Sequence, residues 1–230
     1  MFFGGMQKFS LIDYPGRPCA IVFTMGCNFK CPYCHNPELI SLTKKTFVVV
    51  SEQEILRFLE SRKGKIDAVS ITGGEPTLHD DLLDFMFKLK TMGFLIKLDS
   101  NGTRPLVLQE ALDKKLVDCL AMDVKAPLAK YNSIVASPVV LEDIKKSIDL
   151  IKNSGIDYEF RTTIVKSLLS KEDILEIGDL VSGARRYYLQ KFVPTKTYDS
   201  TFLTQTTYSD EEFETLRKEI APKVQYCKVR

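Results

Sequence analysis

Short apolar runs rich in β-branched residues alternate along the chain with stretches whose apolar residues recur every three or four positions. The runs predict buried strands, and the wider spacing predicts helices that each lay one apolar stripe on a sheet. Strands are predicted at 20–24, 68–72, 94–99, 119–123, 158–163 and 187–191, with a further short strand within 224–229. The helical stripes are Ile55/Phe58/Leu59, Leu82/Phe85/Met86/Leu89, Leu141/Ile144/Ile148/Ile151, Ile174/Ile177/Val181 and Phe213/Leu216/Ile220.

Helix-start and helix-stop signals flank these stripes. A serine followed three residues later by an acid is typical of a reciprocal N-terminal cap, and a glycine is typical of the residue after a helix. The cap pairs are Ser51 with Glu54, Ser170 with Asp173 and Ser209 with Glu212, and the stop glycines are Gly64, Gly93, Gly155 and Gly183. The boundaries of the predicted helices therefore have independent support.

The order of these elements predicts the fold class. Strands that alternate with helices produce a parallel sheet covered by helices. Right-handed crossovers would curl six such strands into an open, partial (β/α)6 TIM-like barrel. We expect a single domain over residues 1–230, with a core at about 18–192 and a C-terminal helix and strand extension at 193–230.

Composition narrows the class of protein. Hydrophobic residues make up 44% and charged residues 27% of the 230 residues, which is typical of a globular protein. No run is long enough for a membrane span, and Met1–Lys8 lacks the pattern of a signal peptide, so we expect a cytoplasmic protein. The formal net charge of +2 is too small to indicate nucleic acid as a partner.

Three of the six cysteines lie in one short loop, at Cys27, Cys31 and Cys34. Thiolates select zinc or iron–sulfur clusters among biological metals. Three ligands leave one iron of a cluster open, whereas a structural metal site is closed by four. The isolated Cys19, Cys119 and Cys227 are expected to be reduced thiols buried in the core, since free cysteine is among the most buried residue types.

Polar motifs follow most of the predicted strands. The cysteine loop follows the first strand, and Gly73-Gly74-Glu75-Pro76 follows the second. Asp99-Ser100-Asn101-Gly102-Thr103 and Asp123-Val124-Lys125 follow the third and fourth, and Arg161 stands near the end of the fifth. Loops at the carboxyl ends of parallel strands gather ligands, so these motifs are expected to form one site.

The cysteine triad followed by Thr72-Gly73-Gly74-Glu75-Pro76 resembles the radical S-adenosylmethionine (SAM) enzymes. The resemblance implies that Cys27, Cys31 and Cys34 hold one [4Fe-4S] cluster and that SAM chelates its fourth iron. The reduced cluster then donates an electron to the sulfonium, and the resulting 5′-deoxyadenosyl radical abstracts a hydrogen atom. The alternative is a zinc ion on the three cysteines, with His35 as fourth ligand.

The same resemblance implies contacts to SAM at Tyr33, His35, Gly73, Gly74, Glu75, Ser100, Asn101, Asp123, Lys125 and Arg161. Tyr33 would stack on the adenine, and Glu75 would accept hydrogen bonds from the amino group of SAM. Each has a purely structural alternative. These are loop packing for Tyr33, a tight turn for the glycines with Glu75, an Asx turn at Asn101-Gly102, a salt bridge between Asp123 and Lys125, and pairing with a neighbouring acid for Arg161.

A closer resemblance lies in two stretches, Gln7 to Gly16 and Gly26 to Glu38. They resemble the activating proteins of anaerobic ribonucleoside-triphosphate reductases, a family of glycyl-radical enzyme activases. This implies a glycyl-radical enzyme as the protein substrate and a one-electron donor such as flavodoxin or ferredoxin. Gln190 stands where some relatives carry a histidine.

Other functions stay open on the sequence alone. They are activation of another glycyl-radical enzyme of the pyruvate formate-lyase type, a radical SAM reaction on a small molecule, and a noncatalytic iron–sulfur or zinc protein. The last predicts no SAM binding, which would leave Glu75 and the pair Asp123 and Lys125 without a common ligand.

Overall fold

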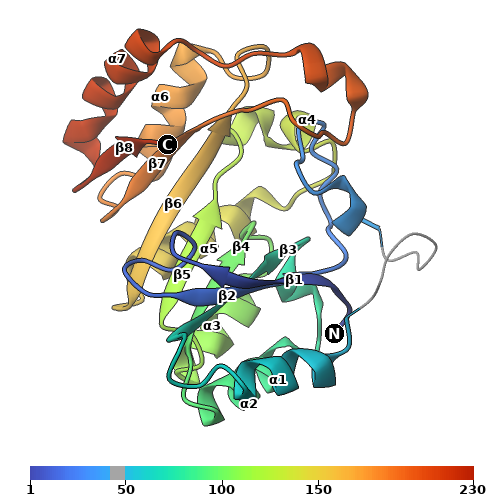
Figure 1. Ribbon diagram of the computed structural model, residues 1–230. Coiled ribbons are helices and arrows are strands. Elements are labelled where there is room, and N and C mark those ends of the chain that lie inside the picture. The colour runs from blue at the N-terminus through green and yellow to red at the C-terminus, as the bar shows by residue number, and fades with distance from the viewer. Residues whose placement is uncertain (42–49) are drawn as a thin grey trace. The chain divides into compact units, whose positions relative to one another are not determined.

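The computed structural model describes residues 1–41 and 50–230 of the chain, and its strands follow one another in chain order across an eight-stranded sheet within that part (Figure 1). The strands are β1 Phe3–Ser10, β2 Cys19–Thr24, β3 Ala68–Gly73, β4 Leu95–Ser100, β5 Cys119–Asp123, β6 Asp157–Ile164, β7 Tyr187–Lys191 and β8 Cys227–Val229. β1 pairs with β2 antiparallel, whereas the pairs β2–β3, β3–β4, β6–β7 and β7–β8 are parallel. The predicted α/β class with a mostly parallel sheet is confirmed.

Helices alternate with the strands as the apolar stripes predict. The α-helices of the described residues are α1 Glu52–Glu60, α2 Leu82–Thr91, α3 Pro105–Asp113, α4 Tyr131–Ile134, α5 Leu141–Lys152, α6 Lys171–Leu180 and α7 Asp210–Ile220. Short 3-10 helices lie at η1 Pro37–Leu39, η2 Pro76–Leu78, η3 Leu128–Lys130, η4 Ser200–Thr204 and η5 Ala221–Lys223. None of the described helices is long and apolar enough to cross a membrane.

The predicted helix caps are confirmed. The side chains of three serines, Ser51, Ser170 and Ser209, each accept a hydrogen bond from the backbone N–H three residues on. The carboxylate at that later position accepts a hydrogen bond from the backbone N–H of the serine. Such a box satisfies two backbone N–H groups that the first helical turn leaves unpaired. All four predicted stop glycines adopt a positive φ.

The chain divides into two compact units. Unit 1 comprises Met1–Asn28, Glu38–Ser100 and Leu106–Leu120, and unit 2 comprises Phe29–Pro37, Asn101–Pro105 and Ala121–Arg230. In unit 1, β2, β3 and β4 carry fully buried residues such as Val22, Ile71 and Leu98. In unit 2, Phe160 and Leu189 of the sheet are fully buried, as is Ile220 of α7. The single-domain organisation stays a prediction.

Candidate active site

The start of the cysteine loop is held by backbone hydrogen bonds within unit 1. Gly26 N donates to Leu39 O at 2.7 Å, and Cys27 N donates to Ile40 O at 3.1 Å. Gly26 O in turn accepts from Glu75 N at 2.7 Å. The first cysteine of the triad and the Gly-Gly-Glu-Pro motif are therefore joined through a single glycine.

Gly73 and Gly74 are required by this close packing. Gly73 has a φ of +118°, and a Cβ there would lie 2.5 Å from the backbone of Thr24. A Cβ on Gly74 would lie 2.1 Å from Gly26 O. Real Cβ atoms do not approach backbone so closely, so only glycine lets these strands and the cysteine loop meet.

Glu75 is a buried carboxylate at the centre of this motif, with 1% of its surface exposed. Its Oε1 accepts hydrogen bonds from Thr77 N at 3.1 Å, from Thr77 Oγ1 at 2.5 Å and from Ser100 Oγ at 2.9 Å. Two predicted site residues, Glu75 and Ser100, are thus brought together in unit 1. Thr77 was missed, because a threonine after a proline carries no signal of its own in the sequence.

The second half of the cysteine motif lies in unit 2. Cys34 N donates to Cys31 O at 3.0 Å, so the loop turns back on itself between these cysteines. Burial raises the pKa of the Cys31 thiol to about 11, although the nearby Lys125 ammonium opposes the rise. A metal ion bound to this thiol would therefore have to displace its proton.

Tyr33 lies between these two cysteines and is 4% exposed. Among the described residues, its hydroxyl has no hydrogen-bond partner. Burial also raises the pKa of Tyr33 well above its usual value. A buried hydroxyl of this kind usually finds a partner, so an unpaired one indicates a site that a ligand completes.

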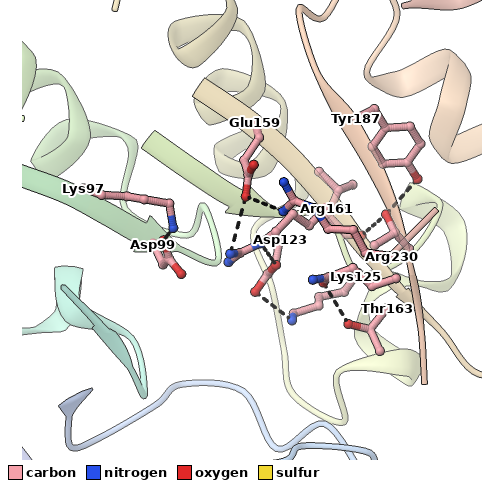
Figure 2. Close-up of polar contacts among 12 residues, drawn as sticks. Lys97, Asp99, Asp123, Lys125, Glu159, Arg161, Thr163, Tyr187 and Arg230 are labelled. Atoms are coloured by element: carbon pink, nitrogen blue, oxygen red, sulfur yellow. Dashed lines mark hydrogen bonds and ion pairs between the residues drawn. The ribbon is translucent and has the colours of Figure 1, made fainter. Parts of the chain in front are cut away.

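Asp123, Lys125 and Arg161 form a connected set of charges in unit 2 (Figure 2). Lys125 Nζ lies 3.1 Å from Asp123 Oδ2, and Arg161 Nε donates to Asp123 Oδ1 at 2.9 Å. Burial alone would raise the pKa of Asp123, but the two cations outweigh it and hold that pKa well below its usual range. The pKa of Lys125 is raised by Asp123 despite burial. The salt-bridge alternative for these residues is thus present in the structure.

Replacement of Asp123 by asparagine is expected to destabilise the protein by about 3 kcal/mol at neutral pH, because two partly buried cations lose their shared partner. The Asp123 pKa is lowered on folding, so its contribution is present above the unfolded pKa of about 3.9 and lost as the pH falls further. Urea unfolding from pH 7 to pH 3 checks this. The stability difference between wild type and Asp123→Asn should shrink toward acid pH, and an unchanged difference would contradict the assignment.

His35 and Asn101 each make contacts within unit 2. His35 Nε2 lies 2.8 Å from Val193 O, and its ring stacks on Phe192 with 5.5 Å between centroids. Asn101 Oδ1 accepts from Thr103 N at 3.1 Å and from Thr103 Oγ1 at 2.8 Å, which is the Asx turn considered from the sequence. The SAM contacts predicted for these residues stay predictions.

The donor set suits an iron–sulfur cluster and its nucleotide ligand. Three thiols are the soft ligands that such clusters require, and the unpaired Tyr33 hydroxyl is a feature that a bound group completes. In the described residues, no three His, Cys, Asp or Glu side chains gather as a site for a single metal ion. Cys27 belongs to unit 1, whereas Cys31 and Cys34 belong to unit 2. The role of the three cysteines as ligands of one cluster is therefore inferred from their spacing in the sequence.

Comparison with known proteins agrees with these features. Residues 21–181 match the radical SAM superfamily, and the chain belongs to this superfamily of enzymes. Within it, the chain is a member of the family of glycyl-radical enzyme activating enzymes. A protein of Methanocaldococcus jannaschii that carries this name is 38% identical over 203 residues, which span 86% of this chain and 82% of that one.

Two further similarities cover most of the chain. The pyruvate formate-lyase-activating enzyme of Clostridium pasteurianum is 27% identical over 84% of this chain and 81% of its own. The structure of Streptococcus suis SuiB bound to S-adenosylmethionine shares the fold with a TM-score of 0.69 and 16% identity, over 91% of this chain and 49% of that one. Radical SAM enzymes use a [4Fe-4S] cluster and SAM, so these are the cofactors of the chain.

Proposed function

We propose that the chain installs a glycyl radical on an anaerobic ribonucleoside-triphosphate reductase. The observation that carries this proposal is the pair of stretches from Gln7 to Gly16 and from Gly26 to Glu38, which resemble the activating proteins of such reductases. Membership of the activase family supports a protein substrate. The electron donor is a small one-electron carrier such as flavodoxin or ferredoxin. Reduction of the cluster by this donor and formation of the glycyl radical both take place in the cytoplasm.

The residues of the chain have distinct roles in this proposal. Cys27, Cys31 and Cys34 hold the cluster, which supplies the electron that cleaves SAM. Buried Glu75, with its carboxylate fixed by Thr77 and Ser100, binds the amino group of SAM through a charge-assisted hydrogen bond. The remaining proposed contacts orient the nucleotide and exclude water, through the Tyr33 ring and through the backbone at Gly73 and Gly74.

Lys125 and Arg161 supply positive charge for the carboxylate of SAM. Asp123 holds both cations in place, since each contacts one of its two oxygens. The three side chains form a preorganised group, so little rearrangement is needed when the nucleotide binds. His35 and Asn101 complete the proposed set of contacts to SAM.

A reconstitution experiment tests the proposal. The chain is loaded anaerobically with iron and sulfide, reduced, and given SAM together with either an anaerobic ribonucleotide reductase or a pyruvate formate-lyase. The expected result with the reductase is 5′-deoxyadenosine together with a glycyl-radical electron paramagnetic resonance (EPR) signal, and with the lyase no glycyl-radical signal. A signal only with the lyase would favour the second activase function and overturn the first.

Replacement of Glu75 by glutamine is expected to keep the cluster and to weaken SAM binding by about tenfold, because a hydrogen bond to a charged acceptor contributes about 1.5–3 kcal/mol. Equilibrium binding of SAM to the reconstituted variant measures the effect, with iron content as the check on loading. Glu110→Gln, which alters an exposed carboxylate of α3 paired with Lys114, is the matched control. Unchanged SAM affinity in Glu75→Gln would remove this residue from the site.

A further inference from the structure

The peptide group between Val124 and Lys125 is held at both of its ends by buried hydroxyl groups of unit 2. Its carbonyl oxygen, Val124 O, accepts a hydrogen bond from Thr162 Oγ1 at 2.7 Å. Its N–H group, on Lys125, donates to Tyr131 Oη at 3.3 Å. Val124, Tyr131 and Thr162 are all fully buried, so both bonds are shielded from bulk water. We call Thr162 and Tyr131 the hydroxyl pair.

The hydroxyl group of Thr162 is itself oriented by a further buried residue. A carbonyl oxygen can only accept, so the single hydroxyl proton of Thr162 points to Val124 O. Thr162 Oγ1 then accepts from Tyr187 Oη, which donates to it at 2.8 Å. Burial raises the pKa of Tyr187, so this donor stays protonated at neutral pH. Tyr187 therefore fixes the direction of the bond that Thr162 gives to Val124.

The peptide groups on both sides of Val124 are fixed in this way. Val124 N donates to Arg161 O at 2.9 Å, which orients the peptide group before Val124. The hydroxyl pair orients the peptide group after it. A peptide group is planar, so a bond at each end leaves it little freedom to turn. Because β5 ends at Asp123, these bonds, rather than the strand, determine the backbone direction at Lys125.

The backbone direction at Lys125 determines where its ammonium group lies. Lys125 Nζ lies 3.1 Å from Asp123 Oδ2, and 16% of the lysine side chain is exposed (Figure 2). Burial raises the pKa of the Cys31 thiol, and the Lys125 ammonium opposes that rise, so its charge acts on the cysteine loop. In the proposed function, the carboxylate of SAM meets this ammonium group and a cluster iron at the same time. The position of the ammonium group is therefore tightly constrained.

The two cations that pair with Asp123 are supported differently. Arg161 is also held by a second acid, since its Nη1 lies 3.8 Å from Glu159 Oε1. The Lys125 ammonium group ends a long, flexible side chain, and a fixed backbone reduces the number of positions that it can reach. The hydroxyl pair supplies this support to Lys125.

Tyr131 joins the hydroxyl pair to the cysteine loop. Its ring packs edge-on against Phe29, with 6.2 Å between the ring centroids. Val135, the residue after α4, accepts a hydrogen bond from Lys30 N at 3.0 Å. Phe29 and Lys30 stand between the first two cysteines of the motif. A single side chain, that of Tyr131, thus contacts both the cysteine loop and the peptide group of Lys125.

We propose that Thr162, Tyr187 and Tyr131 are positioning residues that hold the Lys125 ammonium group where the carboxylate of SAM binds. This inference rests on the proposed function, in which Lys125 contacts SAM. The three residues act through the backbone of Lys125 and not through contact with the nucleotide. They preorganise the charge, so that less rearrangement is needed when SAM binds.

The variant Thr162→Val tests this proposal, because it removes the hydroxyl group and keeps the shape of the side chain. We expect the reconstituted variant to bind SAM about fivefold more weakly, as for the loss of a neutral hydrogen bond. Thr162→Ser keeps the hydroxyl group and should bind SAM as the wild type does. Tyr131→Phe tests the other end of the same peptide group and replaces Thr162→Val if that variant does not fold. Equilibrium binding of SAM measures each effect, with iron content as the check on loading.

A double-mutant cycle with Lys125 separates positioning from a general structural role. If Thr162 acts through Lys125, Thr162→Val should weaken SAM binding in the wild type but not in a Lys125→Gln background. A general structural loss would lower the affinity by the same factor in both backgrounds. Tyr208→Phe is the matched control, because Tyr208 Oη donates to Leu169 O at 2.9 Å in another buried hydrogen bond of unit 2. This control should leave SAM affinity unchanged.

The outcomes distinguish this inference from the proposed function. The inference alone is overturned if Lys125→Gln weakens SAM binding but Thr162→Val has no effect, or has the same effect in both backgrounds. Unchanged SAM affinity in Lys125→Gln would remove Lys125 from the SAM contacts, and the inference would fail together with that contact. A wild-type chain that does not cleave SAM would overturn the proposed function as a whole.

Discussion

Replacement of Cys31 by alanine is expected to abolish SAM cleavage, because the chain then lacks one of the three thiolates proposed to hold the cluster. Cys31 is 6% exposed and lies in the turn that its carbonyl closes with Cys34 N. Loss of a direct ligand should cost more than the roughly 10- to 100-fold in metal affinity that loss of an outer hydrogen-bond partner costs. Iron and sulfide content, the EPR spectrum of the reduced protein and 5′-deoxyadenosine formation measure the loss.

Cys227→Ala is the matched control for this experiment. Cys227 is also a buried thiol of unit 2, and burial raises its pKa to about 11, as it does for Cys31. It lies outside the cysteine motif, in β8. The control variant is expected to retain the cluster and the cleavage activity. A Cys31→Ala protein with full iron content and activity would falsify the assignment, and a zinc ion in the wild-type protein would support the zinc alternative.

The sequence predicts the parallel strands well because their burial is nearly complete. β2 and β5 consist almost entirely of buried residues, so their apolar runs stand out against polar flanks. The antiparallel β1 was missed. Of its eight residues only Phe3 and Ser10 are buried, and two adjacent glycines break any alternation. The position of β1 is determined by hydrogen bonds to β2, and the local pattern of apolar residues does not reveal such pairing.

Helix α3 was also missed, for a related reason. Leu106 at its start is 83% exposed, whereas Leu108 and Ala111 are fully buried. An exposed apolar residue such as this one disturbs the regular helical spacing of apolar residues from which a helix is predicted. The three capped helices were predicted correctly, since a serine and an acid at fixed spacing are a local signal that needs no tertiary information.

The candidate site was predicted as motifs rather than as contacts. The sequence placed Arg161 within a predicted strand at 158–163, and the structure confirms this position within β6. Its partner Asp123 ends β5, and Val124 N donates to Arg161 O at 2.9 Å. Which acid an arginine pairs with depends on the strand register, and that information is not local. Glu159 was missed because a single acid inside a strand gives no motif.

Replacement of Gly74 by alanine is expected to disrupt the cysteine loop, because the added Cβ would lie 2.1 Å from Gly26 O and 2.7 Å from Gly26 C. These are backbone atoms, so no rotation of a side chain relieves the clash. Gly26 precedes Cys27, so the strain is transmitted directly to the first proposed cluster ligand. Overpacking of this kind costs about 1–3 kcal/mol of stability, and the shift should also lower cluster occupancy.

Gly5→Ala is the matched control, because a Cβ on Gly5 of β1 meets no atom within 4 Å. Thermal unfolding, iron content and SAM cleavage are compared for both variants after the same anaerobic reconstitution. We expect Gly74→Ala to lose stability and most of its cluster, and Gly5→Ala to match the wild type in both. Wild-type iron content in Gly74→Ala would show that the loop tolerates the displacement. The close approach of Gly74 to Gly26 would then be a packing feature without a role in binding the cluster.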